Sequence, residues 1–466
     1  MATVETKPTA TGFEATGIER VEEGNRQHTQ LLDTMWLWWS ANAVVATVAL
    51  GALRIFTGLG FWGSVVVIVA FNILGVLPVA FLSTLGPKTG LAQMPLTRFS
   101  FGLQGAKLPA LFNAVACIGW SAVNAVIGSS LLETATGGRI SQPVALVLLA
   151  LVTTAISVYG YFIVHRYERY AWIPMLLLFG YVFVASASKF NLGIPVSSTG
   201  LSLFVDIATF GGVVFGYAVG WSSYAADYTR RQPANTSPSK VFRYAFAGVI
   251  VPCIVLETLG VLLTTTSGGD APKLIETGPG PLFQHAIGTD TVALVVLGLL
   301  ALSTIANNVP NDYSFALSTQ VLGLRIQRWI LTLAGAVIYV LVAVIALQKF
   351  SVNLQGFLLL IAYWLGSYNA VVLLEHRFRK GNYPVQDYEN ASRLPPGIAA
   401  VVSMLGGLVV AALGVNQFAT IGFQGPISVA VGGHPYGADL GFPLAIIATA
   451  ILYYFLRRWE LARYKR

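Results

Sequence analysis

Twelve apolar stretches, each near the length of a membrane-spanning helix, recur along this chain of 466 residues. Crossing about 30 Å of hydrocarbon takes roughly 20 predominantly apolar residues in a helix. The pattern therefore predicts an all-α polytopic membrane protein with twelve transmembrane helices. We expect these helices at residues 31–53, 59–83, 108–134, 142–161, 168–188, 203–225, 243–267, 288–319, 328–347, 352–374, 395–415 and 437–457.

The composition agrees with a membrane protein and excludes an ordinary soluble one. Hydrophobic residues make up 55% of the chain and charged residues only 10%, against roughly 25% charged in typical soluble domains. Both cysteines, Cys117 and Cys253, lie inside apolar stretches, which favours small core residues over a disulfide. No histidine–carboxylate cluster or catalytic motif lies within the segments, so we expect neither an enzyme nor a cofactor.

The basic residues indicate how the chain is oriented. With the N-terminus inside, 23 of the 28 Lys and Arg residues fall in cytoplasmic loops or tails. Such an excess is typical of the cytoplasmic side, so it supports twelve helices with both termini in the cytoplasm. We expect the protein in the plasma membrane. Topology thus explains the basic loops without a nucleic acid partner. Residues 86–90 only superficially resemble a phosphate loop, so uphill transport would draw on an ion gradient.

The most polar stretch in an apolar setting is residues 303–314, Ser-Thr-Ile-Ala-Asn-Asn-Val-Pro-Asn-Asp-Tyr-Ser. It carries three amides, an aspartate and four hydroxyls, which hydrocarbon cannot satisfy and which must therefore face protein, water or a ligand. Pro310 removes a backbone donor and predicts a bend or break in this eighth segment. Our hypothesis is that the stretch binds a small, flat, polar solute within the membrane.

Interrupted segments recur five helices apart. Trp38–Ala43 in the first segment and the glycine-rich residues 210–224 in the sixth form one such pair. Transporters built from inverted repeats bind solutes at discontinuous helices in matching positions. The alternative is that the glycines only allow close helix packing.

The third and eighth segments form a second pair at the same offset. Trp120 and Asn124 are four residues apart, so one helical face would offer a ring for stacking and an amide for hydrogen bonds. Trp221 would supply the opposite face of the sandwich. The alternative for a tryptophan is an anchor at the membrane interface.

Four motifs in this order resemble those of a known family. They are Trp-Ser-Ala-Asn (39–42), Gly-Trp-Ser-Ala-Val-Asn (119–124), Gly-Trp-Ser-Ser-Tyr-Ala-Ala-Asp-Tyr-Thr-Arg (220–230) and Ala-Asn-Asn-Val-Pro-Asn-Asp-Tyr-Ser (306–314). The chain resembles the nucleobase–cation symporters of the purine–cytosine permease type, related to allantoin, uracil and hydantoin permeases. The resemblance implies a LeuT-like fold of two inverted five-helix repeats. The repeats would occupy residues 31–188 and 203–374, with two further helices in 395–457 and cytoplasmic tails at 1–30 and 458–466.

The resemblance also implies a function. A nucleobase such as cytosine, adenine, guanine or hypoxanthine would be imported by cation symport with alternating access, without an obligatory protein partner. The alternatives are a permease for allantoin, hydantoin or another cyclic ureide, a uracil permease, or a nucleobase sensor without net transport. The substrate-binding residues implied are Ser40, Asn42, Trp120, Asn124, Trp221, Asn307 and Asn308.

The coupling ion has two candidates. Sodium-coupled relatives use two hydroxyls of the eighth helix, which Ser303 and Thr304 match, although such hydroxyls often bond back to their own helix. The Asn-Asn-Val-Pro-Asn pattern resembles proton-driven relatives instead. Glu257, in the middle of the seventh segment, is then the expected proton carrier, and its alternative is a helix-packing acid. We favour the proton.

Other polar residues are assigned lesser roles. Glu133 and Asp312 lie nearer segment ends and are weaker candidates for the proton. Asn311 and Asp312 are not expected to contact the solute, and Pro310 is expected to shape the helix. Asp227 is expected at the cytoplasmic end of the sixth helix, where it could pair with Arg230 or Arg231 as a gate.

Overall fold

The computed structural model describes residues 17–26, 28–159, 161–324 and 326–466, and these residues are mostly helical. Each of the twelve expected segments coincides with one long helix or, in the first, with two. These are α1 (Leu32–Asn42) with α2 (Val45–Ala52), α3 (Gly60–Ser83), α7 (Lys107–Ala135), α8 (Gln142–Tyr159), α9 (Tyr161–Ser186), α10 (Gly200–Gly220), α11 (Pro238–Thr265), α14 (Thr291–Val321), α15 (Arg328–Ala346), α16 (Phe350–Phe378), α17 (Ile398–Ala412) and α20 (Gly441–Tyr464).

Short elements fill the connections between these helices. The connection from α3 to α7 holds three short helices, and the connection from α17 to α20 holds a small antiparallel hairpin that the sequence did not predict. The α-helices are α4 (Leu85–Thr89), α5 (Gln93–Leu96), α6 (Arg98–Gly105), α12 (Ala271–Leu274), α13 (Gly280–Ile287), α18 (Phe418–Ile421) and α19 (Pro426–Ala430). The strands are β1 (Asn416–Gln417) and β2 (Phe423–Gln424), and the 3-10 helices are η1 (Glu23–Asn25), η2 (Leu53–Phe56), η3 (Ala187–Lys189), η4 (Trp221–Ser223), η5 (Gly268–Asp270), η6 (Leu347–Lys349) and η7 (Val385–Asp387).

Helix length and composition support fewer membrane spans than the twelve predicted. Within the described residues, eight helices are long and apolar enough to cross a membrane, or nine if a bent pair counts as one span. One of the eight, Trp329–Phe378, contains both α15 and α16, and two shorter apolar helices cover Gln142–Val158 and Ile398–Ala412. A total of twelve spans stays a prediction.

The helix interruptions differ in part from those expected. The first segment bends by 54° between Leu32–Asn42 and Val45–Phe56, at the predicted polar motif. In the sixth segment α10 runs unbroken through its glycines and ends at Gly220, so the interruption comes after the glycine run. Of the bend or break expected at Pro310, the break is contradicted, since α14 continues across it as one helix. A proline removes only one hydrogen bond, and the remaining ladder and packing keep this helix together.

The outer faces of the helices are apolar and the interior holds many polar groups. Ile345 is 83% exposed and Val184 is 74% exposed, whereas Asn72, Asn113 and many other polar side chains are fully buried. This inverts the pattern of a soluble protein and suits a surface in contact with lipid.

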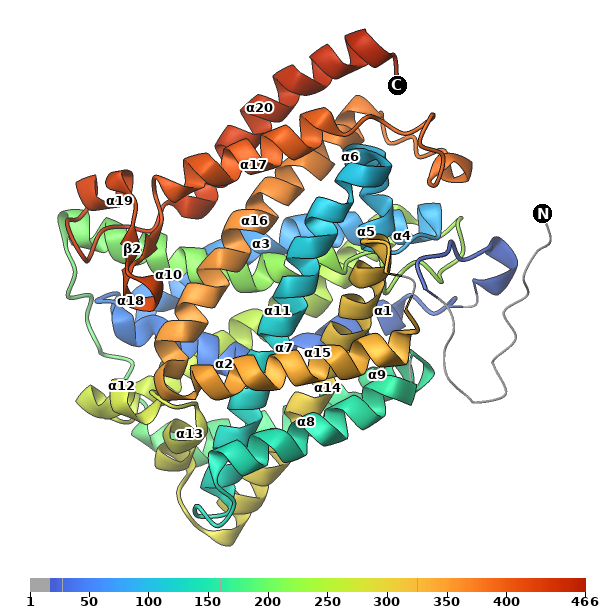
Figure 1. Cartoon of the computed structure of the whole chain (residues 1–466). Helices are drawn as coiled ribbons and strands as arrows, with labels where there is room; N and C mark the ends of the chain where they lie inside the picture. The colour runs from blue at the N-terminus through green and yellow to red at the C-terminus, as the bar shows by residue number, and fades with distance from the viewer. Residues whose placement is uncertain (1–16, 27, 160, 325) are drawn as a thin grey trace.

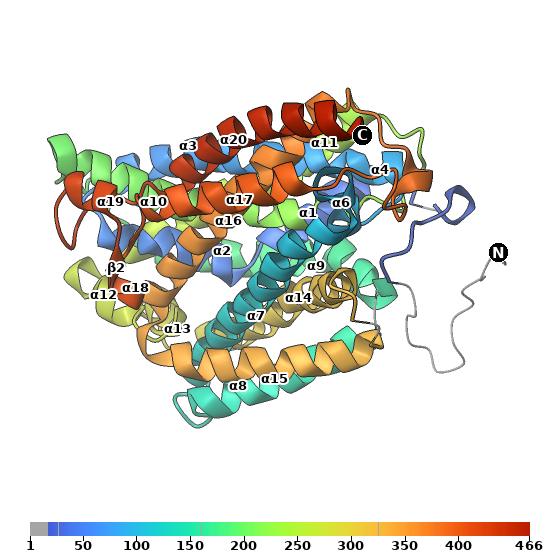
Figure 2. The same ribbon diagram turned by 45° about the horizontal axis from the view of Figure 1, so that its top comes forward.

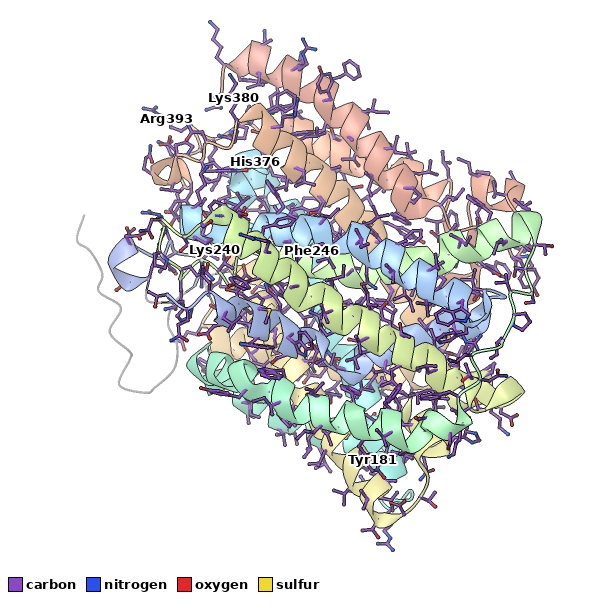
Figure 3. All side chains as sticks on the ribbon, turned by 180° about the vertical axis from the view of Figure 1, so that it is seen from behind. Tyr181, Lys240, Phe246, His376, Lys380 and Arg393 are labelled. Atoms are coloured by element: carbon purple, nitrogen blue, oxygen red, sulfur yellow. The ribbon has the colours of Figure 1, made fainter. Side chains whose placement is uncertain are left out.

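The two ends of the helix bundle carry different elements. In Figure 1, α4, α5 and α6 lie toward the right with the C-terminal end of α20, whereas α12, α18 and α19 lie toward the left. Figure 2 shows α8 and α15 side by side along the lower edge, with α7 and α14 above them. From behind, Lys240 and Arg393 lie toward the end that holds α4–α6 (Figure 3). Both lie in stretches expected as cytoplasmic loops, and the structure places Lys240 in the first turn of α11.

Two glycines bring the backbones of α2 and α11 into direct contact. A methyl group on Gly51 would lie 1.8 Å from the carbonyl oxygen of Glu257, and one on Gly260 would lie 2.0 Å from the carbonyl oxygen of Val48. No side chain larger than hydrogen fits at either position. The second half of the broken first segment is therefore held tightly against α11.

We predict that Gly260→Ala destabilises the fold, because α2 and α11 must separate to admit the methyl group. Overpacking of this kind costs roughly 1–3 kcal/mol. Thermal unfolding in detergent micelles measures the effect. The control is Gly298→Ala on α14, where no other side chain or packed backbone lies within 4 Å of the added carbon. Equal midpoints for the two variants would contradict the packing described.

Candidate functional site

Four of the predicted residues line one pocket inside the bundle. Trp120 and Asn124 come from α7, Trp221 from the first residue after α10, and Asn307 from α14. The cavity between them measures about 20 Å³, room for roughly one water molecule. The side chains must therefore move apart before a planar ring can enter. The remaining lining residues are Tyr217, Gly220, Tyr224 and Asn311.

Aromatic rings form two walls of this pocket. Trp120 packs edge-on against Tyr217, with ring centroids 5.6 Å apart, and against Phe357 of α16 at 5.0 Å. Trp221 packs edge-on against Trp38 of α1 at 5.6 Å. Trp120 and Trp221 are each only 8% exposed, which does not suit anchors at a membrane surface.

Amide side chains connect α7 to α14 beside the rings. Asn307 Nδ2 donates to Asn124 Oδ1 at 3.0 Å, and Asn124 Nδ2 donates to Asn308 Oδ1 at 3.1 Å. Asn308 Nδ2 donates in turn to the carbonyl oxygen of Ser121 at 3.3 Å. Asn308 does not line the pocket, and its hydrogen bond to Asn124 fixes the position of that amide from outside the pocket. By rotating, Asn124 and Asn307 can exchange their mutual bond for donors and acceptors on the edge of a ring.

Asn42 lies behind the pocket wall and holds Trp221. Its Oδ1 accepts from Trp221 Nε1 at 2.8 Å and from Cys253 Sγ at 3.3 Å, and its Nδ2 donates to the carbonyl oxygen of Trp38. With its amide engaged on both sides and fully buried, Asn42 positions the indole and has no free edge for a solute. Ser40 lies on another face of α1, where its Oγ accepts from the backbone N–H of Trp172 in α9 at 3.1 Å. The structure brings neither residue into the pocket.

The pocket also contains residues that the sequence reasoning missed. Asn311 lies in the wall, contrary to the expectation that it would be too far toward the cytoplasm. Tyr224 donates to Asn311 Oδ1 at 3.3 Å and closes the pocket beside it. The spacing held a usable signal. Asn307 and Asn311 are four residues apart on α14 and share a face. Tyr217 and Trp221 have the same spacing, with Trp221 directly after the end of α10.

The two hydroxyls proposed for sodium bond to their own helix. Ser303 Oγ donates to the carbonyl oxygen of Leu300 at 2.6 Å, and Thr304 Oγ1 donates to that of Ala301 at 2.8 Å. Thr304 also packs against Gly128 of α7. This is the back-bonded arrangement considered as the alternative. Pro310 is buried in α14 and does not line the pocket.

Glu257 is a fully buried carboxyl between α11 and α3. Its Oε2 accepts from Asn72 Nδ2 at 2.7 Å, and its Oε1 has no partner among the described residues. Glu257 follows Cys253 by one helical turn, and Cys253 contacts Asn42. Glu133 lies at the end of α7, where its Oε1 accepts from the backbone N–H of Gln142 at 3.0 Å, so it ties α7 to α8.

Asp227 lies after α10, where its carboxyl contacts the backbone of α5. Its Oδ1 accepts from the backbone N–H of Gln93 at 2.6 Å. Burial raises the pKa of Asp227 to about 6, while the Gln93 hydrogen bond and the charge of Arg230 lower it. Arg230 donates to the Tyr313 hydroxyl at 2.9 Å and to the Gly17 carbonyl oxygen at 3.4 Å. The hydrogen bond of Asp227 goes to Gln93, and its pairing with Arg230 or Arg231 as a gate stays a prediction.

Comparison with known proteins supplies the family. The family model described as permease for cytosine/purines, uracil, thiamine, allantoin matches residues 20–423. The purine-cytosine permease fcyB of Emericella nidulans is 34% identical over 469 residues, which cover 97% of this chain and 90% of that protein. The vitamin B6 transporter TPN1 of Saccharomyces cerevisiae is 26% identical over 531 residues, covering 99% of this chain and 90% of that protein.

A solved structure supplies the fold. Mhp1, a nucleobase-cation-symport-1 family transporter solved in a closed conformation with bromovinylhydantoin bound, superposes with a TM-score of 0.73. The match covers 96% of both chains at 15% sequence identity. The arrangement of helices is therefore the LeuT-like fold expected from the sequence motifs.

We predict that Asn124→Ala and Asn308→Ala are energetically coupled, because they share a buried hydrogen bond. In a double-mutant cycle the coupling energy should be on the order of 1 kcal/mol. Unfolding free energies of the single and double variants in mixed lipid–detergent micelles measure it. The matched control is a cycle of Asn124→Ala with Asn72→Ala. The amide of Asn72 bonds Glu257 and not Asn124, so the effects of these two substitutions on the unfolding free energy should be additive. Additivity in both cycles would contradict the amide network.

Proposed function

Because this chain belongs to the family of permeases for cytosine/purines, uracil, thiamine and allantoin, we propose that it imports a nucleobase by cation symport. As a member of this family it is a multi-pass membrane transporter and not an enzyme. The preferred solute in this proposal is cytosine or a purine such as adenine, guanine or hypoxanthine. The protein would work in the plasma membrane with both termini in the cytoplasm. The convergence of two indoles and several amides on one pocket carries the proposal.

The pocket chemistry suits a flat heterocycle. The ring would lie between Trp120 and Trp221, and its edge would meet the amides of Asn124, Asn307 and Asn311. Each amide offers both a donor and an acceptor, so the set can match the alternating edge of a nucleobase. A site that reads a solute by hydrogen bonds rejects analogues that lack those groups. The similarity to fcyB, at 34% identity over nearly the whole chain, favours cytosine and purines.

A cyclic ureide or uracil is the alternative solute. The family description includes uracil and allantoin, and the fold neighbour Mhp1 was solved with a hydantoin. A rotated amide exchanges its donor for its acceptor, so the same side chains could serve these rings. Ureides are less aromatic, and stacking on Trp120 would then contribute less than the edge hydrogen bonds.

A second cavity supports alternating access. It measures about 740 Å³ and lies at the bundle end opposite α4–α6, between α10, α16 and the segment that joins α17 to α20. Asp206, Gln355 and Tyr436 are among its lining residues. In the proposed orientation this end faces the outside. A solute could therefore collect here before the inner pocket opens to admit it.

We propose the proton as coupling ion and Glu257 as its carrier. A buried carboxylate without a cationic partner is costly, so Glu257 should bind a proton for part of the cycle. Its position also relates it to the solute pocket. It lies one turn from Cys253, which shares the Asn42 oxygen with Trp221. Sodium at Ser303 and Thr304 is the alternative, and it would require both hydroxyls to turn their lone pairs toward the ion.

We predict that Trp120→Ala weakens cytosine or purine uptake, because the base loses one stacking face. Base–aromatic stacking contributes about 1–3 kcal/mol, so the concentration for half-maximal uptake should rise roughly 5- to 150-fold. Uptake of the labelled base into liposomes containing the purified protein measures it. The control is Trp62→Ala, at a tryptophan that is 64% exposed on the outer surface.

Competition with unlabelled compounds tests the solute class in the same liposomes. Cytosine, adenine, guanine and hypoxanthine should displace the labelled base at lower concentrations than uracil, allantoin or hydantoins. Stronger displacement by a ureide would favour the alternative, and unchanged uptake by Trp120→Ala would refute the stacking role.

We predict that uptake follows a proton gradient. A protonophore should abolish accumulation of the base in sodium-free buffer, and Glu257→Gln should lose accumulation while still exchanging labelled for unlabelled base. Measurements with and without a sodium gradient provide the control. Accumulation that requires sodium and survives the protonophore would instead favour Ser303 and Thr304.

A further inference from the structure

A second buried carboxyl lies next to the amide network. Asp312 follows Asn308 by one turn of α14 and is only 5% exposed. Its Oδ2 accepts from Ser157 Oγ of α8 at 2.7 Å, and the hydroxyl of Ser121 in α7 faces the same carboxyl. The sequence placed Asp312 near a segment end, where water could reach it. The structure instead encloses it between helices.

The residues that the structure describes around Asp312 provide hydroxyl groups to its carboxyl. Among the described residues no Lys or Arg forms an ion pair with it. The titratable groups close enough to interact with its charge are Cys117 of α7 and Tyr339 of α15. Both are ordinarily uncharged at neutral pH. Among the described side chains, the hydroxyl of Ser157 is the hydrogen-bond donor to an ionised Asp312, which must offset a large cost of burial.

Asp312 and the amide network both contact Ser121 of α7. Ser121 turns its hydroxyl toward Asp312 and accepts from Asn308 Nδ2 through its carbonyl oxygen. Ser121 directly follows Trp120, and Asn308 bonds Asn124. A change in the protonation of Asp312 would therefore act on the segment of α7 that carries Trp120 and Asn124.

We propose that Asp312 takes up and releases a proton during each transport cycle, as a second proton site beside Glu257. This inference rests on the proton-coupled transport proposed above. The proton would come from external water, bond to the carboxylate oxygen and leave to the cytoplasm. As a carboxylate, Asp312 accepts from Ser157 and can also accept from the hydroxyl of Ser121. As an acid it must donate through one oxygen, so at least one of these two contacts is rearranged.

The two proton sites would act on opposite walls of the pocket. Glu257 lies between α3 and α11, on the side where Asn42 holds Trp221. Asp312 lies between α7, α8 and α14, on the side that carries Trp120 and the amides. Protonation of both carboxyls would therefore change both faces that enclose the solute.

Counting protons moved per nucleobase tests the inference. Wild type, Asp312→Asn and Glu257→Gln are placed in liposomes that contain a pH-sensitive dye, and uptake of labelled cytosine and adenine is measured in parallel. Asp312→Asn should still exchange labelled for unlabelled base at equal pH. It should move fewer protons per base than wild type, and its uptake should depend less on external pH.

Ser157→Ala provides a second variant that keeps the carboxyl. It removes one hydrogen bond to the ionised form, so the pH of half-maximal uptake should rise by about one unit. Loss of a purely structural contact would lower uptake at every pH without shifting the profile. This variant also decides the question if Asp312→Asn does not fold.

Wild-type proton counts in Asp312→Asn, or an unshifted pH profile in Ser157→Ala, would overturn the inference and make Asp312 a permanently protonated packing residue. A wild-type protein that neither takes up nor exchanges any nucleobase would instead refute the proposed function. The two failures are therefore distinguishable.

Discussion

A buried amide in a lipid-facing protein must find its hydrogen-bonding partners inside the protein, and this requirement organises the centre of the bundle. The mutual bonds of Asn124, Asn307 and Asn308 tie α7 to α14 where water is scarce. The same groups are the ones that a flat polar solute would need. One set of side chains can therefore stabilise the structure without solute and bind the solute when the walls separate. The cost of leaving an amide unpaired makes this exchange selective for solutes with matching edges.

The two indoles of the pocket depend on different parts of the fold. Trp120 projects from the middle of a long helix, and its neighbours Tyr217 and Phe357 belong to α10 and α16. Trp221 stands where α10 ends, and its ring is set by Asn42 at the end of α1. One wall thus rests on continuous helices and the other on the ends of two helices. Buried carboxyls lie behind both walls, Glu257 on the side of Trp221 and Asp312 on the side of Trp120.

The sequence predicted the helices and half of the pocket for simple physical reasons. Long apolar stretches located α3, α7 and α16, and polar motifs inside such stretches located Trp120, Asn124, Trp221 and Asn307. The direction of a side chain was harder to predict. Asn42 could contact a solute or support a neighbour, and only the fold shows that its partner is an indole 179 positions away. Asn311 was misjudged because depth was estimated from position along a segment, whereas a residue's surroundings depend on the helices packed around it. Asp312 does not line the pocket, as expected, although it is buried.

The backbone contact between α2 and α11 has a mechanical consequence. At Gly51 and Gly260 no side chain separates the two backbones, so neither helix can slide past the other there without moving apart. We therefore expect the two helices to move together, as one lever. The chain between Asn42 and Val45, where the first segment already turns by 54°, offers the nearest joint for that lever. Rotation about this joint would carry Asn42, and with it the ring of Trp221, relative to the rest of the pocket.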